Sequence, residues 1–184
     1  MLAFMAIGAT MHTFDIQLAD VDRGVYDELN LRVARHASET DDFMVTRLLA
    51  YCLEYEEGIA FSTAGIASTD EPAVLIRDLT GLMTAWIDVG APDAERLHYA
   101  NRLAGRTVVY THRDPEKLLA SWEGKTIYRA DEIALRSFDN GFVSQISQNI
   151  ERRNSVTISV SERHIYIDVN GESLSSVLHE YSIG

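Results

Sequence analysis

Carboxylates gather around one expected β-hairpin, in the segment of residues 69–90. Its middle, residues 78–81, reads DLTG, with Asp at the first and Gly at the fourth place of a type I turn. Pairing residues outward from this turn sets Glu71 opposite Asp88, with Asp70 beside them. An oxygen-rich acidic pair suits Mg²⁺, which takes one or two protein carboxylates and completes its shell with water and substrate phosphate.

Asp78 is the rival for this site, because it precedes Asp88 by ten residues in a similar local context. If Asp78 begins the turn, however, Asp88 lies about five residues further along the ladder, on the order of 17 Å away. One metal ion cannot be shared across that gap. The sequence therefore assigns Asp78 to turn formation.

The elements that position the hairpin form an α-β-β-β-α-β core over residues 38–112. Ser38 caps a helix over residues 41–56 that is apolar on nearly every face, with a thin polar strip of Thr46, Arg47 and Glu54. A short strand over 59–61 and hairpin strands near 72–77 and 82–89 follow. The next helix begins at Pro92 and ends at Gly105, and the buried strand 107–110 closes a mixed sheet. The fold class is α/β (α+β).

Further segments add to this core on both sides. Residues 12–35 alternate apolar and polar positions and predict an N-terminal β-hairpin or two edge strands. A C-terminal elaboration, residues 113–184, begins with a helix capped by Asp114 and a strand over 126–128. Residues 131–153 are predicted mostly helical with a break at 139–141, and residues 155–160 with 165–169 predict a hairpin. With 184 residues and 46% apolar composition, the whole chain is expected to form one domain.

Composition excludes several kinds of site. The net charge of -12 disfavours sequence-independent binding to nucleic-acid backbones, which relies on Lys and Arg, although a nucleic-acid partner stays open. The single cysteine, Cys52, permits neither a disulfide framework nor a thiolate zinc site and suits a cytoplasmic protein. No glycine-rich phosphate loop follows a strand, so no nucleotide cofactor is predicted. The apolar first ten residues match neither a signal peptide nor a membrane span.

Four segments carry a resemblance to the YaeQ family of bacterial proteins. They are ARHASETDDFMVTRLLAY (34–51), STDEP (68–72), WIDVGAPD (86–93) and VVYT (108–111). The resemblance implies a compact variant of the PD-(D/E)XK restriction-endonuclease-like fold. Carried over from active nucleases of that superfamily, Asp70 with Glu71 and then Asp88 would be the metal-binding acids, and Glu39 would be a third catalytic acid on a helix.

The chain departs from the nuclease pattern at one position. Active members place a lysine two residues after the second acid, where this sequence has Gly90. Lys117 and Lys125 are the only lysines, and both come after the core. Arg77 is already protonated, so it cannot act as a base and is better suited to binding a phosphate group. Two functions stay open: a Mg²⁺-dependent phosphodiester hydrolase, and an inactive nuclease fold that binds a partner protein or a ligand.

Overall fold

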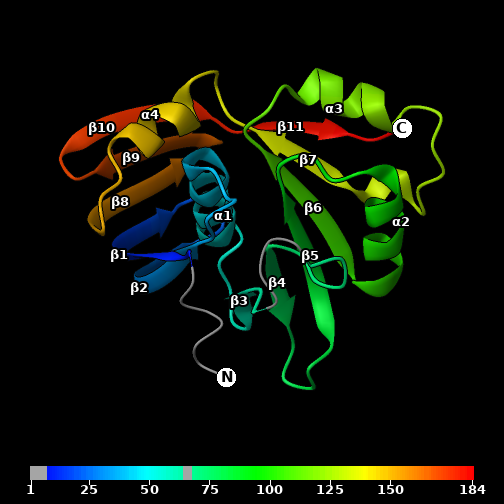
Figure 1. The fold of residues 1–184 in the computed structure, drawn as a ribbon, viewed down its shortest axis with the longest axis horizontal. Helices are drawn as coiled ribbons and strands as arrows, with labels where there is room; N and C mark the ends of the chain where they lie inside the picture. Colours follow the sequence, from blue (N-terminus) through cyan, green and yellow to red (C-terminus); the bar gives the residue numbers. More distant parts are fainter. Residues whose placement is uncertain (1–7, 64–67) are drawn as a thin grey trace. The chain divides into compact units, whose positions relative to one another are not determined.

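The computed structural model describes residues 8–63 and 68–184, which form two compact units (Figure 1). Of the described residues, unit 1 contains 8–45 and 139–178, and unit 2 contains 46–63, 68–138 and 179–184. Each unit has a mixed sheet with helices, so the predicted α+β class is confirmed. That the whole chain folds as one domain stays a prediction. No helix in the described ranges has the length and apolar character needed to cross a membrane.

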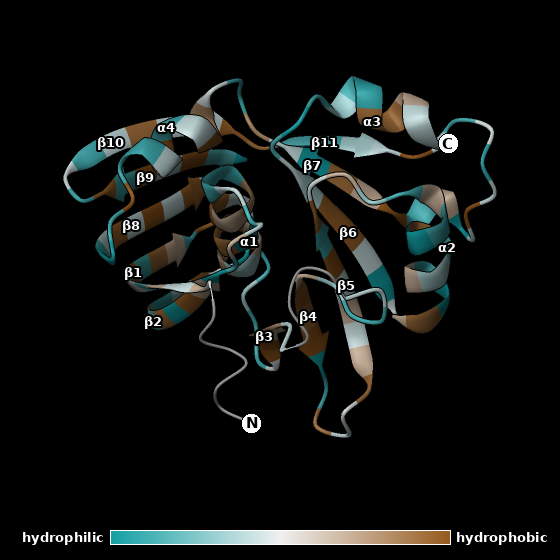
Figure 2. Ribbon diagram, viewed as in Figure 1, coloured by the Kyte–Doolittle hydropathy of each residue, from teal (hydrophilic) through white to brown (hydrophobic). Residues whose placement is uncertain are grey.

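Unit 1 is built on a five-stranded sheet of order β10-β9-β8-β1-β2. Its strands are β1 (Thr10–Asp20), β2 (Val25–Arg35), β8 (Arg153–Ser161), β9 (His164–Val169) and β10 (Glu172–Val177). Only the β1–β8 pair is parallel. Apolar and polar residues alternate along β1 and β8, as the colour bands in Figure 2 show, because one face of the sheet is buried. Both predicted hairpins are confirmed.

The sequence gives weak signals for β10, and this strand was not predicted. Three of its six residues are serine, and only Ser176 is buried. Pairing with β9, rather than intrinsic preference, holds this segment extended. Helix α4 (Phe142–Gln148) also belongs to unit 1 and buries Phe142, Val143 and Ile146.

Unit 2 is built on a six-stranded sheet of order β11-β7-β6-β5-β4-β3. Its strands are β3 (Ile59–Phe61), β4 (Val74–Arg77), β5 (Met83–Val89), β6 (Arg106–Thr111), β7 (Ala134–Ser137) and β11 (His179–Ser182). Strands β5, β6 and β7 are parallel, and the other pairs are antiparallel. Helix α1 (Asp41–Leu53) precedes β3, and α2 (Ala94–Leu103) connects β5 to β6. The predicted α-β-β-β-α-β order is confirmed.

Helices α2 and α3 (Pro115–Trp122) cover one face of this sheet (Figure 1). Leu97 of α2 and Trp122 of α3 pack with Val109 of β6 and Leu135 of β7. Asp93 and Asp114 cap the two helices through their carboxylates, and Pro115 occupies the first turn of α3. The start of α3 was therefore predicted correctly, whereas α2 begins at Ala94 and not at the predicted Pro92.

Two predicted elements in the C-terminal half are wrong. Residues 126–128 form no strand, and the segment 131–153 is not mostly helical. In chain order, this region contains a 3-10 turn, η1 (Ala130–Glu132), then strand β7, then the short helix α4. Residues 134–137, ALRS, have no strong strand preference of their own, and the parallel pairing with β6 determines their conformation.

The turn of the β4–β5 hairpin is confirmed, whereas its predicted register is wrong. The Asp78 carboxylate accepts hydrogen bonds from the Thr80 hydroxyl and from the N–H groups of Thr80 and Leu82, and these bonds lower the pKa of Asp78. Arg77 pairs with Met83 instead of Leu82, and a bulge after Ile76 adds one more residue, so Ile76 pairs with Ala85 instead of Met83. Strand β4 begins at Val74, so Glu71 precedes the strand.

Candidate functional site

Asp88, the second predicted acid, lies near the end of β5 and is held by Arg96 of α2. The guanidinium binds both carboxylate oxygens, with Nε–Oδ2 and Nη2–Oδ1 distances of 2.8 and 2.9 Å. The Asp88 side chain is 4% exposed and that of Arg96 is 22% exposed. A bidentate pair of this kind has the strongest geometry available to an arginine and a carboxylate.

Local sequence positions Arg96 for this contact. Asp93 caps α2 by accepting a hydrogen bond of 2.8 Å from the Arg96 N–H, which fixes the first turn of the helix beside the end of β5. A cation in the first turn opposes the helix dipole, so it requires a nearby anion. This unfavourable placement is the sequence signal that could have identified Arg96 as the partner of Asp88, and it was missed.

The same guanidinium also holds the segment that leads into β4. Its two terminal nitrogens donate to the backbone carbonyl oxygens of Ser68 and Glu71, at 2.8 and 2.9 Å. Its carbon lies 5.2 Å from the centre of the Trp86 ring. Arg96 therefore joins β5, α2 and the residues before β4 through one side chain.

The carboxylate of Glu71 has partners of its own. It accepts a hydrogen bond of 2.8 Å from the Ser62 hydroxyl and lies 3.4 Å from a guanidinium nitrogen of Arg77. Asp70 is exposed, and its N–H donates to the Ser68 hydroxyl oxygen. Asp88 and the backbone of Glu71 thus meet at Arg96, but the two carboxylates contact different cations.

Glu39 belongs to unit 1, where it is buried beside the start of α1. Its carboxylate accepts a hydrogen bond from the His36 N–H, and its carbonyl oxygen accepts one from the Arg35 guanidinium. These contacts account for its burial at a helix entrance. Its role as a third catalytic acid stays a prediction.

The acids of this region do not fit a metal ion in the arrangement seen. Both oxygens of Asp88 are bound by Arg96, so a Mg²⁺ ion would have to displace a cation that cannot lose its charge. Within residues 8–63 and 68–184, no group of three or more His, Cys, Asp or Glu side chains is arranged to hold a metal.

Gly90, at the position of the nuclease lysine, has a backbone reason to be glycine. Its φ is 90°, and its N–H donates to the carbonyl oxygen of Tyr110 at 2.9 Å. This left-handed conformation strains any residue with a Cβ atom. Lys117 and Lys125 are exposed, on α3 and just after it.

Gly90→Ala is expected to lower the free energy of unfolding by about 1 to 2 kcal/mol, because alanine is strained at a positive φ. Urea-induced unfolding would measure the loss. Gly90→Asn is the matched control and should lose less, since asparagine tolerates this conformation better. An alanine variant as stable as the wild type would contradict the backbone explanation for the missing lysine.

A second polar cluster in unit 2 is centred on two buried side chains, Glu54 and Tyr110. Glu54, one residue beyond α1, accepts hydrogen bonds from the Tyr110 hydroxyl at 2.8 Å and from Arg136 at 2.6 Å. Arg106 binds its other oxygen at 2.8 Å, and Arg136 also binds Glu180 at 2.9 Å. The polar strip that sequence placed on α1 thus turns inward here, although its role was not recognised.

Burial and the neighbouring Glu54 carboxylate raise the pKa of Tyr110 far above its ordinary value, so its hydroxyl stays protonated and donates. Burial alone would lower the pKa of Arg136, but Tyr110 and Glu54 raise it overall. Charges and hydrogen bonds are matched within the cluster. It therefore stabilises the sheet and offers no free acid or base.

A family model described as YaeQ protein matches residues 5–178. The chain belongs to the YaeQ family. The YaeQ protein of Escherichia coli (strain K12), described as uncharacterized, is 34% identical over 108 residues, which span 59% of each chain. The uncharacterized YaeQ protein of Salmonella typhi is 27% identical over 166 residues, 89% of this chain and 90% of the relative.

Two solved YaeQ structures share this fold. The crystal structure from Pseudomonas syringae has a TM-score of 0.85 and 26% identity, with 96% of this chain and 98% of that chain covered. The structure from Xanthomonas axonopodis pv. citri has a TM-score of 0.86 and 26% identity, with 96% and 99% covered. The YaeQ resemblance inferred from sequence is confirmed.

Proposed function

We propose that this YaeQ protein is a catalytically inactive member of the restriction-endonuclease-like superfamily and acts by binding a partner. The α-β-β-β-α-β order around a mixed sheet supports the superfamily assignment. The bidentate contact between Asp88 and Arg96 is the observation that carries the loss of catalysis. In this proposal the guanidinium is a permanent cation in the place where an active enzyme would bind a metal.

Three properties of Arg96 support this assignment. An arginine side chain keeps its positive charge in proteins, so Arg96 cannot take a proton from water and cannot act as a base. Its planar fork matches the carboxylate of Asp88, and removing it would leave a buried charge unpaired. Its further bonds to Ser68 and Glu71 tie it to the surrounding backbone. Displacing it would therefore break several contacts at once.

The competing function is a Mg²⁺-dependent phosphodiester hydrolase. Asp70, Glu71 and Asp88 would then hold the metal after Arg96 had moved away, and Glu39 would support them. One observation favours the hydrolase: Arg96 contacts both the Asp88 carboxylate and the backbone of Glu71, so the two predicted acids lie near the same positive charge. The net charge of -12 opposes a nucleic-acid substrate and is compatible with a protein partner in the cytoplasm.

Thermal unfolding in the presence of Mg²⁺ or Mn²⁺ separates the two functions. The melting temperature of the wild type is expected to stay constant up to millimolar metal, because a ligand that does not bind the folded state does not stabilise it. Arg96→Gln should instead gain stability as metal is added, since it exposes the Asp88 carboxylate. The double variant Arg96→Gln/Asp88→Asn is the control and should lose that gain.

Incubation with Mg²⁺ and single-stranded, duplex and branched DNA and RNA completes the test. We expect these substrates to remain intact. Three results together would overturn the proposal in favour of the hydrolase. Metal would stabilise the wild type, Asp88→Asn would abolish that stabilisation, and the wild type would cleave at least one of these substrates.

A further inference from the structure

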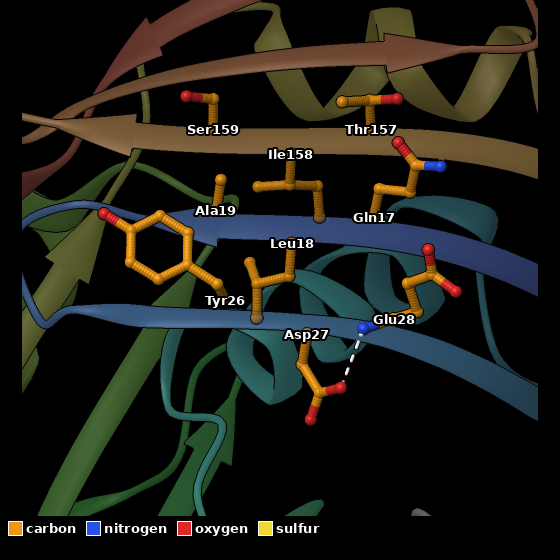
Figure 3. A pocket seen from close by; sticks show the side chains of 9 residues that line it. All are labelled: Gln17, Leu18, Ala19, Tyr26, Asp27, Glu28, Thr157, Ile158 and Ser159. Carbon is orange, nitrogen blue, oxygen red and sulfur yellow. Dashed lines mark hydrogen bonds between the residues drawn. The ribbon is translucent and has the colours of Figure 1, made fainter.

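The outer face of the unit 1 sheet has two exposed tyrosines separated by small side chains. The strand registers place Tyr26, Ala19, Ser159 and Tyr166 side by side on β2, β1, β8 and β9. Figure 3 shows the Tyr26 ring beside Ala19, with Ser159 beyond it. Tyr26 is 65% exposed and Tyr166 is 53% exposed. At about 4.8 Å per strand step, the two tyrosines stand about 14 Å apart.

This face is hollowed from one tyrosine to the other. A hollow of about 650 Å³ lies over β2, β1 and β8 and includes Tyr26, while another of about 420 Å³ lies over β8, β9 and β10 and includes Tyr166. Thr157 and Ser159 line both hollows, so the two are continuous. The small residues between the tyrosines form the floor of the resulting groove.

The charge of the groove selects the kind of occupant. In the row next to the tyrosines, the registers align Glu28, Gln17, Thr157 and Asp168, and Asp15 follows on the same face of β1. None of the side chains in these two rows is a lysine or an arginine. Acidic oxygens beside aromatic faces attract cations and repel phosphate groups, so a cationic ligand is complementary to this groove.

We propose that this groove binds a basic segment of a partner protein in extended conformation, with one Lys or Arg side chain on Tyr26 and another on Tyr166. The proposal rests on the proposed function, in which the protein acts by binding. An extended chain advances about 3.3 Å per residue, so 14 Å corresponds to cations about four residues apart. Side chains at that spacing point to the same side of the segment, as simultaneous contact with both tyrosines requires.

Fluorescence anisotropy with a dye-labelled peptide tests the proposal. The probe carries two lysines about four residues apart in a Thr/Val sequence, and the control peptide has glutamates in their place. We expect the lysine peptide alone to bind. Tyr26→Ala and Tyr166→Ala should each weaken binding about fivefold, and their combination about 25-fold, as for the loss of cation–π contacts. Glu28→Gln should also weaken it, and more strongly at low salt.

Matched substitutions in unit 2 serve as controls. Tyr128→Ala removes another exposed tyrosine and Glu95→Gln another exposed acid, and neither should change the affinity. Equal binding of the two peptides, or affinity unaffected by both tyrosine variants, would overturn the proposal. The proposal would also be overturned if sedimentation showed that wild-type chains associate with one another and that Tyr26→Ala prevents this association. The groove would then bind a second copy of the chain.

The outcome is distinguishable from failure of the proposed function. Metal-dependent cleavage of nucleic acid would overturn the proposed function, while the peptide titrations would still decide whether this groove binds a basic segment. Absence of lysine-peptide binding in a protein that cleaves nothing would remove only this groove as the binding surface.

Discussion

Glu54→Ala is expected to lower the free energy of unfolding by about 4 kcal/mol, the largest single effect on stability that we anticipate. The Glu54 carboxylate is 6% exposed and is bound by Tyr110, Arg136 and Arg106. Removing it leaves the Tyr110 hydroxyl without its acceptor and Arg136 with less compensating charge, in a region that water does not reach easily. Breaking a buried ion pair from one side costs more than the pair itself contributes.

Chemical denaturation at neutral pH would measure this loss. Tyr110→Phe is the graded control, expected to cost about 1 kcal/mol, because it removes one hydrogen bond and keeps the ring and the ion pairs. The stability difference between Tyr110→Phe and the wild type should shrink as the pH rises above 10. The tyrosine ionises near 10.0 in the unfolded wild type but has a raised pKa in the folded state, so the wild type alone loses stability there. A Glu54→Ala protein within about 1 kcal/mol of the wild type would show that the cluster is not stabilising.

Arg96→Met is expected to cost about 3 kcal/mol, somewhat less than the Glu54 change because Arg96 is 22% exposed and water can screen part of the charge left on Asp88. Methionine keeps much of the aliphatic length, so the loss reports the guanidinium and its four hydrogen bonds. Arg102→Met, an exposed position near the end of the same helix, should change stability by less than about 0.5 kcal/mol.

A double-mutant cycle with Asp88→Asn isolates the ion pair. Once Asp88 carries no charge, Arg96→Met should cost less, with a coupling of about 1 to 3 kcal/mol between the two sites. Strictly additive losses would mean that the contact between Asp88 and Arg96 contributes little. Arg96 would then hold the structure through Ser68 and Glu71 alone.

Local signals in the sequence were sufficient for most elements of the fold. Asp114 identifies a helix start through its capping chemistry, and the Asp78–Gly81 turn depends on contacts within five residues. The long alternation in β1 and β2 reflects one buried face. These features need no knowledge of distant residues, and all were predicted correctly.

Features that depend on distant partners were missed or misplaced. The β4–β5 pairing differs from the predicted register by one residue at Arg77 and by two from Ile76 onward, after the bulge, so Glu71 does not stand opposite Asp88. β7 becomes a strand only through its pairing with β6. For the candidate site, the sequence predicted Asp88 and Glu71 but not Arg96, which contacts both. Arg96 lies on a different element from Asp88, and it contacts Glu71 through the backbone carbonyl oxygen, so neither contact can be inferred from local sequence.

The parallel pairing of β1 with β8 determines when the unit 1 sheet can be completed. Thr13 pairs with Arg153, so the ribosome must synthesise most of the chain before β1 gains its second neighbour. Until then the nascent β1–β2 hairpin has an unpaired inner edge, whereas β3 to β7 of the other unit all emerge earlier. Contacts of such high sequence separation form slowly, so we expect the β1–β8 pairing to form late and the edge of β1 to be open to aggregation until it does.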